Sequence, residues 1–530
     1  MSIRFWNRYI IPPMNTPSLI ASLRLSFLPP LMVYVAAGIS GLTGIAGTFF
    51  VKDYLGLSAE FLAVLGFWAG LPWALKMPVG HVVDLFWRWK EAMVLFGAGL
   101  LAASIGIMIG LLADPAAMRS VMPAERWFVL ASMLGPVGFM VQDVVADAMT
   151  VEAVPRLQAD GREIGAEERR AMHTTMQTLG RVAIIGGSVL VALANVFFMS
   201  GVQALPEQGK TAAYLHVYQW ALVIPLVSVA GVVFAAWLRR RNPGQYLRRP
   251  DPPPANWWIL GGGLAFTAIS LAVGLGSIVR GQEIIFCASM AIVLFLMWRL
   301  VRELDPAARS TLVGTAVVIF VYRAMPGPGA GATWWAIDEL GFDQQFISQL
   351  SLLGSALTLA GLFAFRRFMA ERSIYFIVGF LVVIGTLLSL PNTGMYYGLH
   401  HWTASLTGGV VDARFIALVD TALESPLGQI AMVPMLAWIA NSAPEKLKAT
   451  YFAVMASFTN LALSASQLGT QYLNQWYVVS REVRDPVSKA VTVAADYSQL
   501  GELLIVVTVI GLVVPLVAIV VVRAGRMRSG

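Results

Sequence analysis

The stretch VKDYLGLSAEFLAVLG, residues 51–66, recurs later in the chain without a gap as AIDELGFDQQFISQLS, residues 336–351. Five positions are identical: Asp53, Leu55, Gly56, Phe61 and Leu65 match Asp338, Leu340, Gly341, Phe346 and Leu350. Each stretch follows a long apolar run and precedes the next one. Such a parallel repeat is typical of membrane proteins built from two helical halves that are related by an axis along the membrane normal.

The composition excludes an ordinary water-soluble domain. Hydrophobic residues make up 57% of the 530 residues and charged residues only 13%, whereas soluble proteins carry about 25% charged residues. A protein core cannot remove this much apolar surface from water, so part of the surrounding solvent must be lipid. The chain is therefore predicted to be an integral membrane protein that has the lipid bilayer as a partner.

Apolar runs follow one another along most of the chain, and most are about 20 residues long, which is the length needed to cross a bilayer. The sequence predicts an all-α polytopic fold with about 14 transmembrane helices. We expect these helices near residues 28–50, 60–81, 91–112, 127–152, 171–200, 215–238, 257–279, 283–301, 310–332, 345–366, 373–391, 414–440, 448–475 and 499–523.

The formal net charge of +7 comes from basic residues that gather in alternate loops. Cytoplasmic loops of membrane proteins carry an excess of Lys and Arg, so both termini are predicted to be cytoplasmic, in a bacterial inner (plasma) membrane. Because topology explains these charges, no nucleic-acid partner is expected. The single cysteine, Cys287, has no partner for a disulfide or a metal cluster, and neither a metal nor a cofactor is predicted.

One segment interrupts the series of apolar runs. RRRNPGQYLRRPDPPPAN, residues 239–256, is basic and rich in proline, as expected of a cytoplasmic linker. The predicted domains are a six-helix half at 1–238, the linker at 239–256, an additional transmembrane hairpin at 257–309 and a second six-helix half at 310–530. The oligomeric state is left open by the sequence.

Several charged residues fall inside the predicted helices, where a charge costs about 2.5–3.5 kcal/mol even on lenient insertion scales. The basic ones are Lys76, Arg181, Arg323 and Arg414, and the acidic ones are Asp84, Asp143, Asp147, Glu152, Asp420 and Glu424. Such residues are expected to face a water-filled cavity, to pair with one another or to lie near a helix end. For Glu152, near the cytoplasmic end, pairing with a loop arginine is the preferred interpretation.

Two acidic pairs have helical spacing. Asp143 and Asp147 are four residues apart and share one helical face, as do Asp420 and Glu424 on the fourth helix of the second half. The repeat thus places an acidic pair on equivalent helices of both halves. If these helices line a central cavity, the pairs flank one transport path and Arg323 is the cation that faces them. A purely structural role for both pairs is the alternative.

GHVVDLFWRWK, residues 80–90, contains a glycine, an acid and an arginine at regular spacing. Gly80, Asp84 and Arg88 match a pattern seen in the loop between the second and third helices of the major facilitator superfamily. The pattern predicts a tight approach at Gly80 and an Asp–Arg contact that latches the cytoplasmic ends of helices. GLFAFRRF, residues 361–368, keeps the glycine as Gly361 and two arginines but lacks the acid, so only one complete latch is predicted.

Several stretches resemble the folate–biopterin transporter family of the major facilitator superfamily. They are LPWALKMPVGHVVD (71–84), QDVVADAMTVEAVPR (142–156), YRAMPGPGAGATWWAIDELGF (322–342) and QIAMVPMLAWIANSAPEKLKATYFAVMASFTNLALSASQLG (429–469). The resemblance implies a secondary carrier, coupled to protons, for folate- or pterin-like solutes. The positions that match the family are Lys76, Pro78, Gly80, Asp84, Asp143, Asp147, Glu152, Arg323 and Pro326. KMPVG and WRWKEA depart from the family pattern, so the exact solute stays open.

Three other interpretations compete. Bacterial muropeptide permeases are similar around QDVVADA and also have two additional helices. The two acidic pairs are similar to the motifs with which membrane prenyltransferases hold a magnesium diphosphate, but each lacks an upstream acid, so an enzyme is not predicted. A carrier fold without transport, as in a sensor or an assembly factor, is not excluded by the fold.

The predicted function is secondary active transport, in which two halves rock about a midplane cavity and open to each side in turn. Asp143 or Asp147 takes up a proton, and its burial makes protonation depend on access to water. Arg323 holds an anionic group of the solute, such as a glutamyl carboxylate. Trp334 and Trp335 are predicted to be anchors at the membrane interface rather than a stacking platform for the solute.

Overall fold

The computed structural model describes residues 24–154, 162–241, 255–302, 306–365, 372–428, 448–484 and 491–525, without residues 56, 163 and 277, together with residues 368 and 430. These residues form two compact units. The 78–260 unit also includes residues up to 47, and the 261–525 unit also includes residues 48–77. Residues 48–77, which the sequence assigns to the first half, thus pack within the unit that holds the second half. The predicted domain boundaries stay a prediction.

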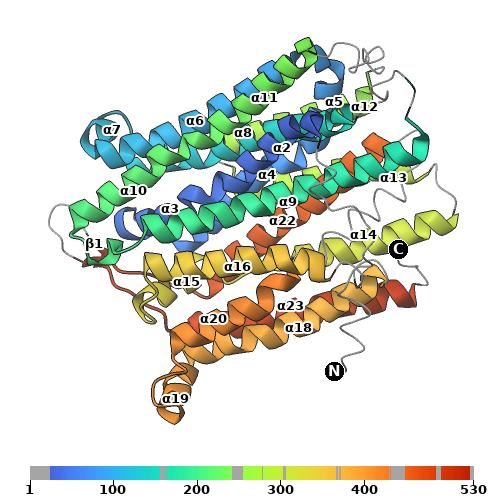
Figure 1. Ribbon diagram of the computed structural model, residues 1–530. Coiled ribbons are helices and arrows are strands. Elements are labelled where there is room, and N and C mark those ends of the chain that lie inside the picture. The colour runs from blue at the N-terminus through green and yellow to red at the C-terminus, as the bar shows by residue number, and fades with distance from the viewer. Residues whose placement is uncertain are drawn as a thin grey trace. The chain divides into compact units, whose positions relative to one another are not determined.

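Helices make up nearly all of the regular structure (Figure 1). The elements before the linker, with η for a 3-10 helix, are η1 (Leu25–Phe27), α2 (Leu28–Gly38), η2 (Ile39–Thr43), α3 (Gly44–Tyr54), α4 (Ala59–Ala74), α5 (Lys76–Leu85), η3 (Trp87–Trp89), α6 (Lys90–Ala113), α7 (Pro115–Val121), α8 (Ala124–Ala153), α9 (Ala166–Phe198), η4 (Val202–Ala204), α10 (Glu207–Ala221) and α11 (Val223–Arg241).

The elements after the linker are α12 (Trp257–Leu275), α13 (Gly281–Val301), α14 (Pro306–Arg323), α15 (Ala330–Asp338), α16 (Gln344–Ala364), α18 (Ile374–Tyr396), α19 (Leu399–Leu406), α20 (Ala413–Glu424), η5 (Ser425–Leu427), α22 (Lys448–Trp476), β1 (Val483–Arg484), β2 (Val491–Val493) and α23 (Leu500–Ala524). The two strands pair in an antiparallel manner. They belong to the connection between α22 and α23.

The helices agree with the predicted series of spans. Within the described residues, 11 segments are long and apolar enough to cross a membrane. Three predicted spans lie outside that set: 310–332 corresponds to α14 and α15, 414–440 begins as α20 and continues into residues outside the described ranges, and 448–475 corresponds to α22. The predicted all-α polytopic fold is confirmed.

The position of α8 in the 78–260 unit is set by its packing along α6. The two backbones approach closely where Gly97 faces Gly138, because a Cβ on Gly97 would lie 2.7 Å from the carbonyl oxygen of Gly138. Only glycine, which has no Cβ, permits so close an approach. The crossing fixes the next turns of α8, which carry Asp143 and Asp147.

The repeated stretch forms the same local structure twice in the 261–525 unit. Ser58 accepts a hydrogen bond of 3.0 Å from the backbone N–H of Phe61 at the start of α4, and Asp343 accepts one of 2.8 Å from Phe346 at the start of α16. Ser58 and Asp343 occupy equivalent positions of the repeat, as do the two phenylalanines. Because Ser and Asp are strong N-cap residues, the repeat carries the start signal of a helix.

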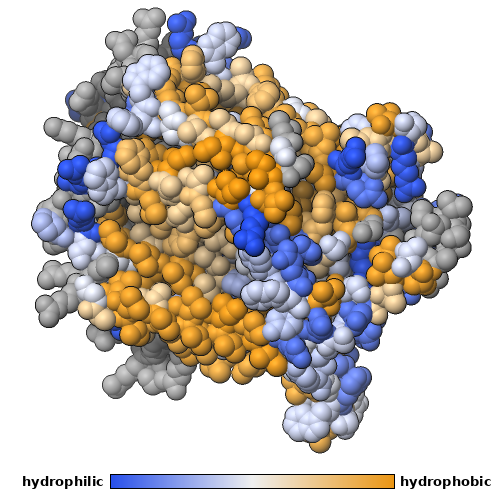
Figure 2. All heavy atoms as spheres, turned by 180° about the vertical axis from the view of Figure 1, so that it is seen from behind, coloured by the Kyte–Doolittle hydropathy of each residue, from blue (hydrophilic) through white to orange (hydrophobic). Residues whose placement is uncertain are grey.

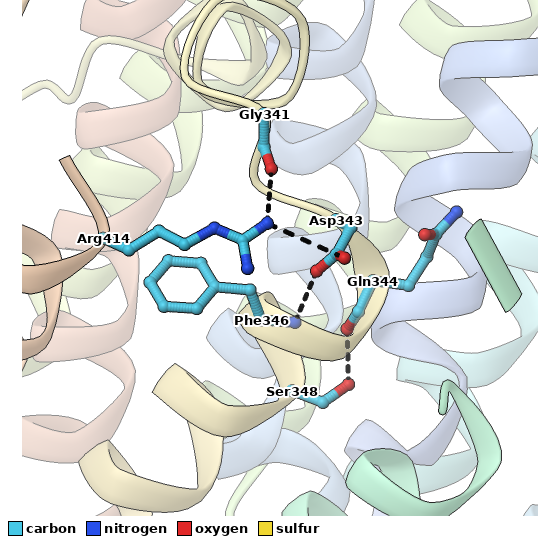
Figure 3. A network of polar contacts seen from close by, with 6 residues as sticks. All are labelled: Gly341, Asp343, Gln344, Phe346, Ser348 and Arg414. Carbon is cyan, nitrogen blue, oxygen red and sulfur yellow. Dashed lines mark hydrogen bonds and ion pairs between the residues drawn. The ribbon is translucent and has the colours of Figure 1, made fainter. Parts of the chain in front are cut away.

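Arg414, one of the charges placed inside a predicted span, lies in the first turn of α20. Its guanidinium donates a hydrogen bond of 2.9 Å to the carbonyl oxygen of Gly341 and lies 3.7 Å from the carboxylate of Asp343 (Figure 3). It also covers the ring of Phe346 at 4.9 Å. Gly341 has a φ of +66°, which favours glycine. Arg414 therefore connects α20 to the turn before α16 and supports the fold.

The additional hairpin, formed by α12 and α13, contacts two helices of the 261–525 unit. α13 packs against α22, where the hydroxyl of Tyr472 donates a hydrogen bond to the carboxylate of Glu283. On α12, a Cβ at Gly274 would lie 3.0 Å from the indole of Trp68 on α4. The hairpin is thus fixed to α22 and α4.

Large apolar side chains lie exposed on the outer faces of the helices, and Figure 2 shows them over much of one face. Phe197 on α9 is 79% exposed and Val520 on α23 is 65% exposed. Leaving apolar surface in water costs about 25 cal/mol per Å². These faces are therefore suited to contact with lipid.

Candidate functional site

The first acidic pair lies on α8, within a candidate span, and both carboxylates are half-buried. The hydroxyl of Tyr34 on α2 donates a hydrogen bond of 2.6 Å to Oδ1 of Asp147. Tyr34 is only 5% exposed, and the charges of Asp143, Asp147 and Arg181 lie within electrostatic reach of its hydroxyl. The structure thus gathers three of the predicted intramembrane charges around one buried tyrosine.

The second acidic pair lies on α20, in the 261–525 unit. Asp420 is 7% exposed, and its Oδ2 accepts a hydrogen bond of 2.6 Å from the side-chain amide of Asn392 on α18. Glu424 is exposed one turn further along and lies within electrostatic reach of Asp420 and Tyr322. The charge of Arg323, the last residue of α14, also lies within electrostatic reach of the Tyr322 hydroxyl. Arg323 and Glu424 therefore share Tyr322 as a neighbour.

The helix that opens each predicted half is interrupted. The five-residue 3-10 segment η2 separates α2 from α3, and residues 324–329 separate α14 from α15. Tyr34 lies just over one turn before the first interruption, and Arg323 lies directly before the second. A 3-10 stretch inside a helix often marks a functional hinge, and discontinuous helices line the binding sites of many carriers.

Three side chains of α22, each one turn from the next, bond to the backbone of residues 325–328. The bonds are Ser466 Oγ to the Met325 carbonyl oxygen (2.7 Å), the Gly327 N–H to Thr470 Oγ1 (3.0 Å) and Asn474 Nδ2 to the Pro328 carbonyl oxygen (3.3 Å). At membrane depth a backbone polar group needs a partner within the protein. This polar stripe therefore makes the interruption possible.

The predicted latch residues lie at the end of α5 and in η3. A Cβ on Gly80 would lie 3.8 Å from Cγ1 of Val144, an ordinary contact, so the predicted tight approach at Gly80 is wrong. The charge of Asp84 acts on the imidazole of His81, whose Nε2 accepts a hydrogen bond of 2.8 Å from the backbone N–H of Asn256 at the end of the linker. Arg88 is exposed in η3.

The close approach occurs instead at Gly361, the glycine of the corresponding stretch in the second half. A Cβ there would lie 2.6 Å from Cα of Pro426 in η5. The two stretches thus differ because a helix backbone crosses α16 at Gly361, whereas the nearest described atom to Gly80 is a side-chain methyl.

The remaining predicted residues lie near helix ends or in the interruption. Lys76 is the half-buried first residue of α5, which also contains the half-buried Pro78. Pro326 lies within residues 324–329, against Gly469 of α22. Glu152 is in the last turn of α8, but its side chain lies outside the described part of the chain. The predicted roles of these residues stay predictions.

An ion pair joins the two repeated segments within the 261–525 unit. Nζ of Lys52, next to Asp53, lies 2.6 Å from Oδ1 of Asp338, the residue that matches Asp53. The hydroxyl of Tyr497 donates a hydrogen bond of 2.6 Å to Oδ2 of the same carboxylate. Burial and the Asp338 charge raise the pKa of the Tyr497 phenol. This cluster connects α3, α15 and the connection that precedes α23.

Trp334 and Trp335 are 2% and 9% exposed, so the prediction that they are interfacial anchors is wrong. The guanidinium of Arg481 covers Trp334 at 5.2 Å, and Trp335 belongs to an apolar cluster with Phe342 and Leu473. Both indoles of the short α15 are buried against neighbouring elements, so they face protein rather than the membrane surface.

Sequence reasoning missed the uncharged partners of the predicted charges. Only acids and bases stand out as charges inside a predicted span. The partners in the structure carry no charge: Tyr34 and Tyr322 are phenols, and Asn392 is an amide. Their polarity inside apolar runs was a usable signal, but which acid each one faces depends on helix packing. The spacing of Ser466 and Thr470 on α22 was a second usable signal.

The fold and these intramembrane polar clusters define a polytopic membrane protein. Residues 37–528 match the model of the BT1 family, and the chain belongs to this family. It is 24% identical over 465 residues to a folate-biopterin transporter of Synechocystis sp., covering 87% of this chain and 77% of that protein. It is 26% identical over 167 residues to putative folate transporter 2 of Plasmodium berghei, covering 30% of this chain and 34% of that protein.

Solved structures of peptide transporters share the fold. The chain superposes on a crystal structure of the peptide transporter POT with a TM-score of 0.58 and 15% identity, covering 95% of both chains. It superposes on a POT family transporter in complex with 5-aminolevulinic acid with a TM-score of 0.60 and 11% identity, covering 94% and 96% of the two chains. The predicted family is confirmed, and because its relatives are transporters the prenyltransferase interpretation is excluded.

Proposed function

We propose that the chain is a proton-coupled symporter of a folate- or pterin-like organic solute, working by alternating access as a major-facilitator carrier. The observation that carries this proposal is the carboxylate of Asp147, held by Tyr34 inside a spanning helix. Ionisable residues in spanning helices are costly and are usually found on solute or proton paths. The names of the relatives, a folate-biopterin transporter and a putative folate transporter, supply the solute class.

Each polar cluster has a role in this proposal. Asp143 and Asp147 form the proton path in the 78–260 unit, and Asp420 and Glu424 contribute acidic groups in the 261–525 unit. Arg323 binds an anionic group of the solute, because it is half-buried and lies directly before the interruption of its helix. An Arg guanidinium suits a carboxylate, since its planar fork makes two parallel hydrogen bonds.

The membrane orientation is part of the proposal. Basic residues gather in alternate connections, for example the three arginines at the end of α11, whose Arg239 pairs with Glu91. By the positive-inside rule these connections and both termini are cytoplasmic, in a bacterial inner membrane. The ion pair between Lys52 and Asp338 then lies on the outer side.

Uptake into proteoliposomes tests the proposal. Labelled folate and a labelled pterin are offered with and without an inward proton gradient, to wild type, to Asp147→Asn and to Asp114→Asn. The last variant is the matched control, because Asp114 is an exposed N-cap of α7 and Asn caps a helix equally well. We expect gradient-driven uptake by wild type and by Asp114→Asn, and its loss in Asp147→Asn.

Other outcomes contradict parts of the proposal. Uptake that is indifferent to the gradient and to Asp147→Asn means that the acids are structural. Uptake of a muropeptide, without uptake of folate or pterin, shows that the solute class is wrong. A folded protein that takes up none of these compounds contradicts transport of this solute class and favours a non-transporting membrane protein.

A further inference from the structure

Tyr34 is held rigidly over the backbone of α9. A Cβ on Gly180 would lie 2.8 Å from Cε2 of Tyr34, so only glycine leaves room for the phenol ring at this point. One turn further along α2, Gly38 meets Gly187, where an added Cβ on Gly187 would lie 2.8 Å from Cα of Gly38. This glycine crossing brings α2 onto α9 and places the hydroxyl of Tyr34 beside Asp147.

Among the described residues, the charged groups that act on Tyr34 come from two helices. α8 contributes Asp143 and Asp147, and α9 contributes Arg181. α11 also packs against α2, but the contact at Gly231 involves Pro29, Met32 and Val33, and the titratable residues of α11 are the arginines of its last turn. The phenol therefore lies among two carboxylates and one guanidinium.

We propose that Tyr34 is the positioning residue for the proton-coupling acid, and that this acid is Asp147. The inference rests on the proposed function and names which acid of the pair exchanges the proton. In the unprotonated state the Tyr34 hydroxyl donates to the carboxylate. When a proton from the outside adds to the carboxylate, the phenol keeps its own proton. Its O–H turns away and its oxygen accepts a hydrogen bond from the new carboxylic acid, so the contact persists in both states.

The chemistry of the contact explains the choice of Asp147. A hydroxyl reverses its hydrogen bond by rotation about one bond, without displacing the ring that Gly180 confines. In contrast, Asp420 faces the amide of Asn392, which must turn its whole side-chain plane to change from donor to acceptor. The phenol is therefore the partner that suits an acid which gains and loses a proton in every cycle.

A hydrogen bond donated to the charged form of an acid favours that form. Replacing Tyr34 by Phe keeps the ring in its place and removes the donor, so protonated Asp147 should persist to higher pH.

Infrared difference spectroscopy on purified full-length protein measures this titration directly. The carboxylic-acid band that disappears in Asp147→Asn is followed against pH in wild type, Tyr34→Phe and Tyr218→Phe. Tyr218 is the matched control, because it is a buried tyrosine of the same unit whose hydroxyl bonds to Thr43. We expect the midpoint to move upward in Tyr34→Phe and to stay unchanged in Tyr218→Phe.

An unchanged midpoint in Tyr34→Phe, or an equal shift in both variants, overturns the proposal, as does a titrating band that disappears with Asp143→Asn instead. The pH profile of uptake provides the second readout: Tyr34→Phe should shift it in the same direction with the KM for the solute within about twofold, whereas a purely structural role lowers uptake equally at every pH. If Tyr34→Phe shows the spectroscopic shift but wild type shows no gradient-driven uptake, the proposed function fails while the positioning role of Tyr34 stands.

Discussion

Replacing Gly361 by Ala should destabilise the protein, whereas the same change at Gly80 should not. Gly361 lies where α16 crosses η5, the 3-10 helix that begins directly after Glu424. At the same crossing the Thr358 hydroxyl donates a hydrogen bond of 2.9 Å to the Ser425 carbonyl oxygen. A Cβ on Gly361 would lie 2.6 Å from Cα of Pro426. Since two carbon atoms prefer a separation of about 3.5–4.0 Å, η5 would have to move by about 1 Å.

The magnitude follows from two opposing effects. Overpacking of this kind costs about 1–3 kcal/mol. Gly→Ala within a helix also favours folding by about 1 kcal/mol, and because both glycines lie inside helices this gain applies equally to both variants. The difference in stability between Gly80→Ala and Gly361→Ala therefore isolates the steric cost, about 1–3 kcal/mol.

Thermal unfolding in one detergent, followed by tryptophan fluorescence, measures this difference. The unfolding midpoint of Gly361→Ala should lie below that of wild type, and that of Gly80→Ala should equal or exceed it. Gly354 and Gly361 face the same crossing, so Gly354→Ala, where the nearest atom is a serine hydroxyl at 3.2 Å, should have a smaller effect. A Gly361→Ala midpoint at or above that of Gly80→Ala would refute the reasoning, because it would show that α16 and η5 are not in close backbone contact.

Three further predictions concern polar contacts. A double-mutant cycle with Lys52→Met and Asp338→Asn should give a coupling of about 1 kcal/mol in unfolding experiments, and additive effects would contradict the ion pair. Thr470→Val leaves the N–H of Gly327 without its partner and should cost about 1–3 kcal/mol, so an unchanged unfolding midpoint would count against the role of the polar stripe. Burial and the neighbouring His401 lower the pKa of His400. Its contribution to stability is therefore present above the unfolded pKa of about 6.5 and is lost as the pH falls. The loss of stability on acidification should be smaller in His400→Gln than in wild type.

Most of the fold could be predicted because its determinants are local in the sequence. A run of apolar residues of sufficient length gives a span wherever it occurs. The repeat was informative for the same reason, since Ser58 and Asp343 each cap the helix that follows them. The grouping of residues 48–77 with the later part of the chain has no such local signal, because it depends on which faces of distant helices fit together.

The site was only partly predictable. Its acids were found because a charge inside an apolar run is conspicuous and costly. The partner of Asp147 was not found, because the approach of Tyr34 depends on the crossing between Gly38 and Gly187. Gly80 shows the opposite error: the motif was recognised, but whether a glycine is needed depends on what lies opposite to it in three dimensions.

The interruptions of the two opening helices also differ in how their backbone polar groups are satisfied. In η2 the chain keeps short-range helical hydrogen bonds, and Ser188 adds a bond of 3.3 Å to the carbonyl oxygen of Gly38 just before it. Residues 324–329 have no helical conformation, so their backbone groups need donors and acceptors from outside the segment. Thr470 and its neighbours one turn away on α22 supply them. These three side chains of α22 thus serve the break in the helix that carries Arg323, and an apolar substitution at one of them should disturb the break before it disturbs α22 itself.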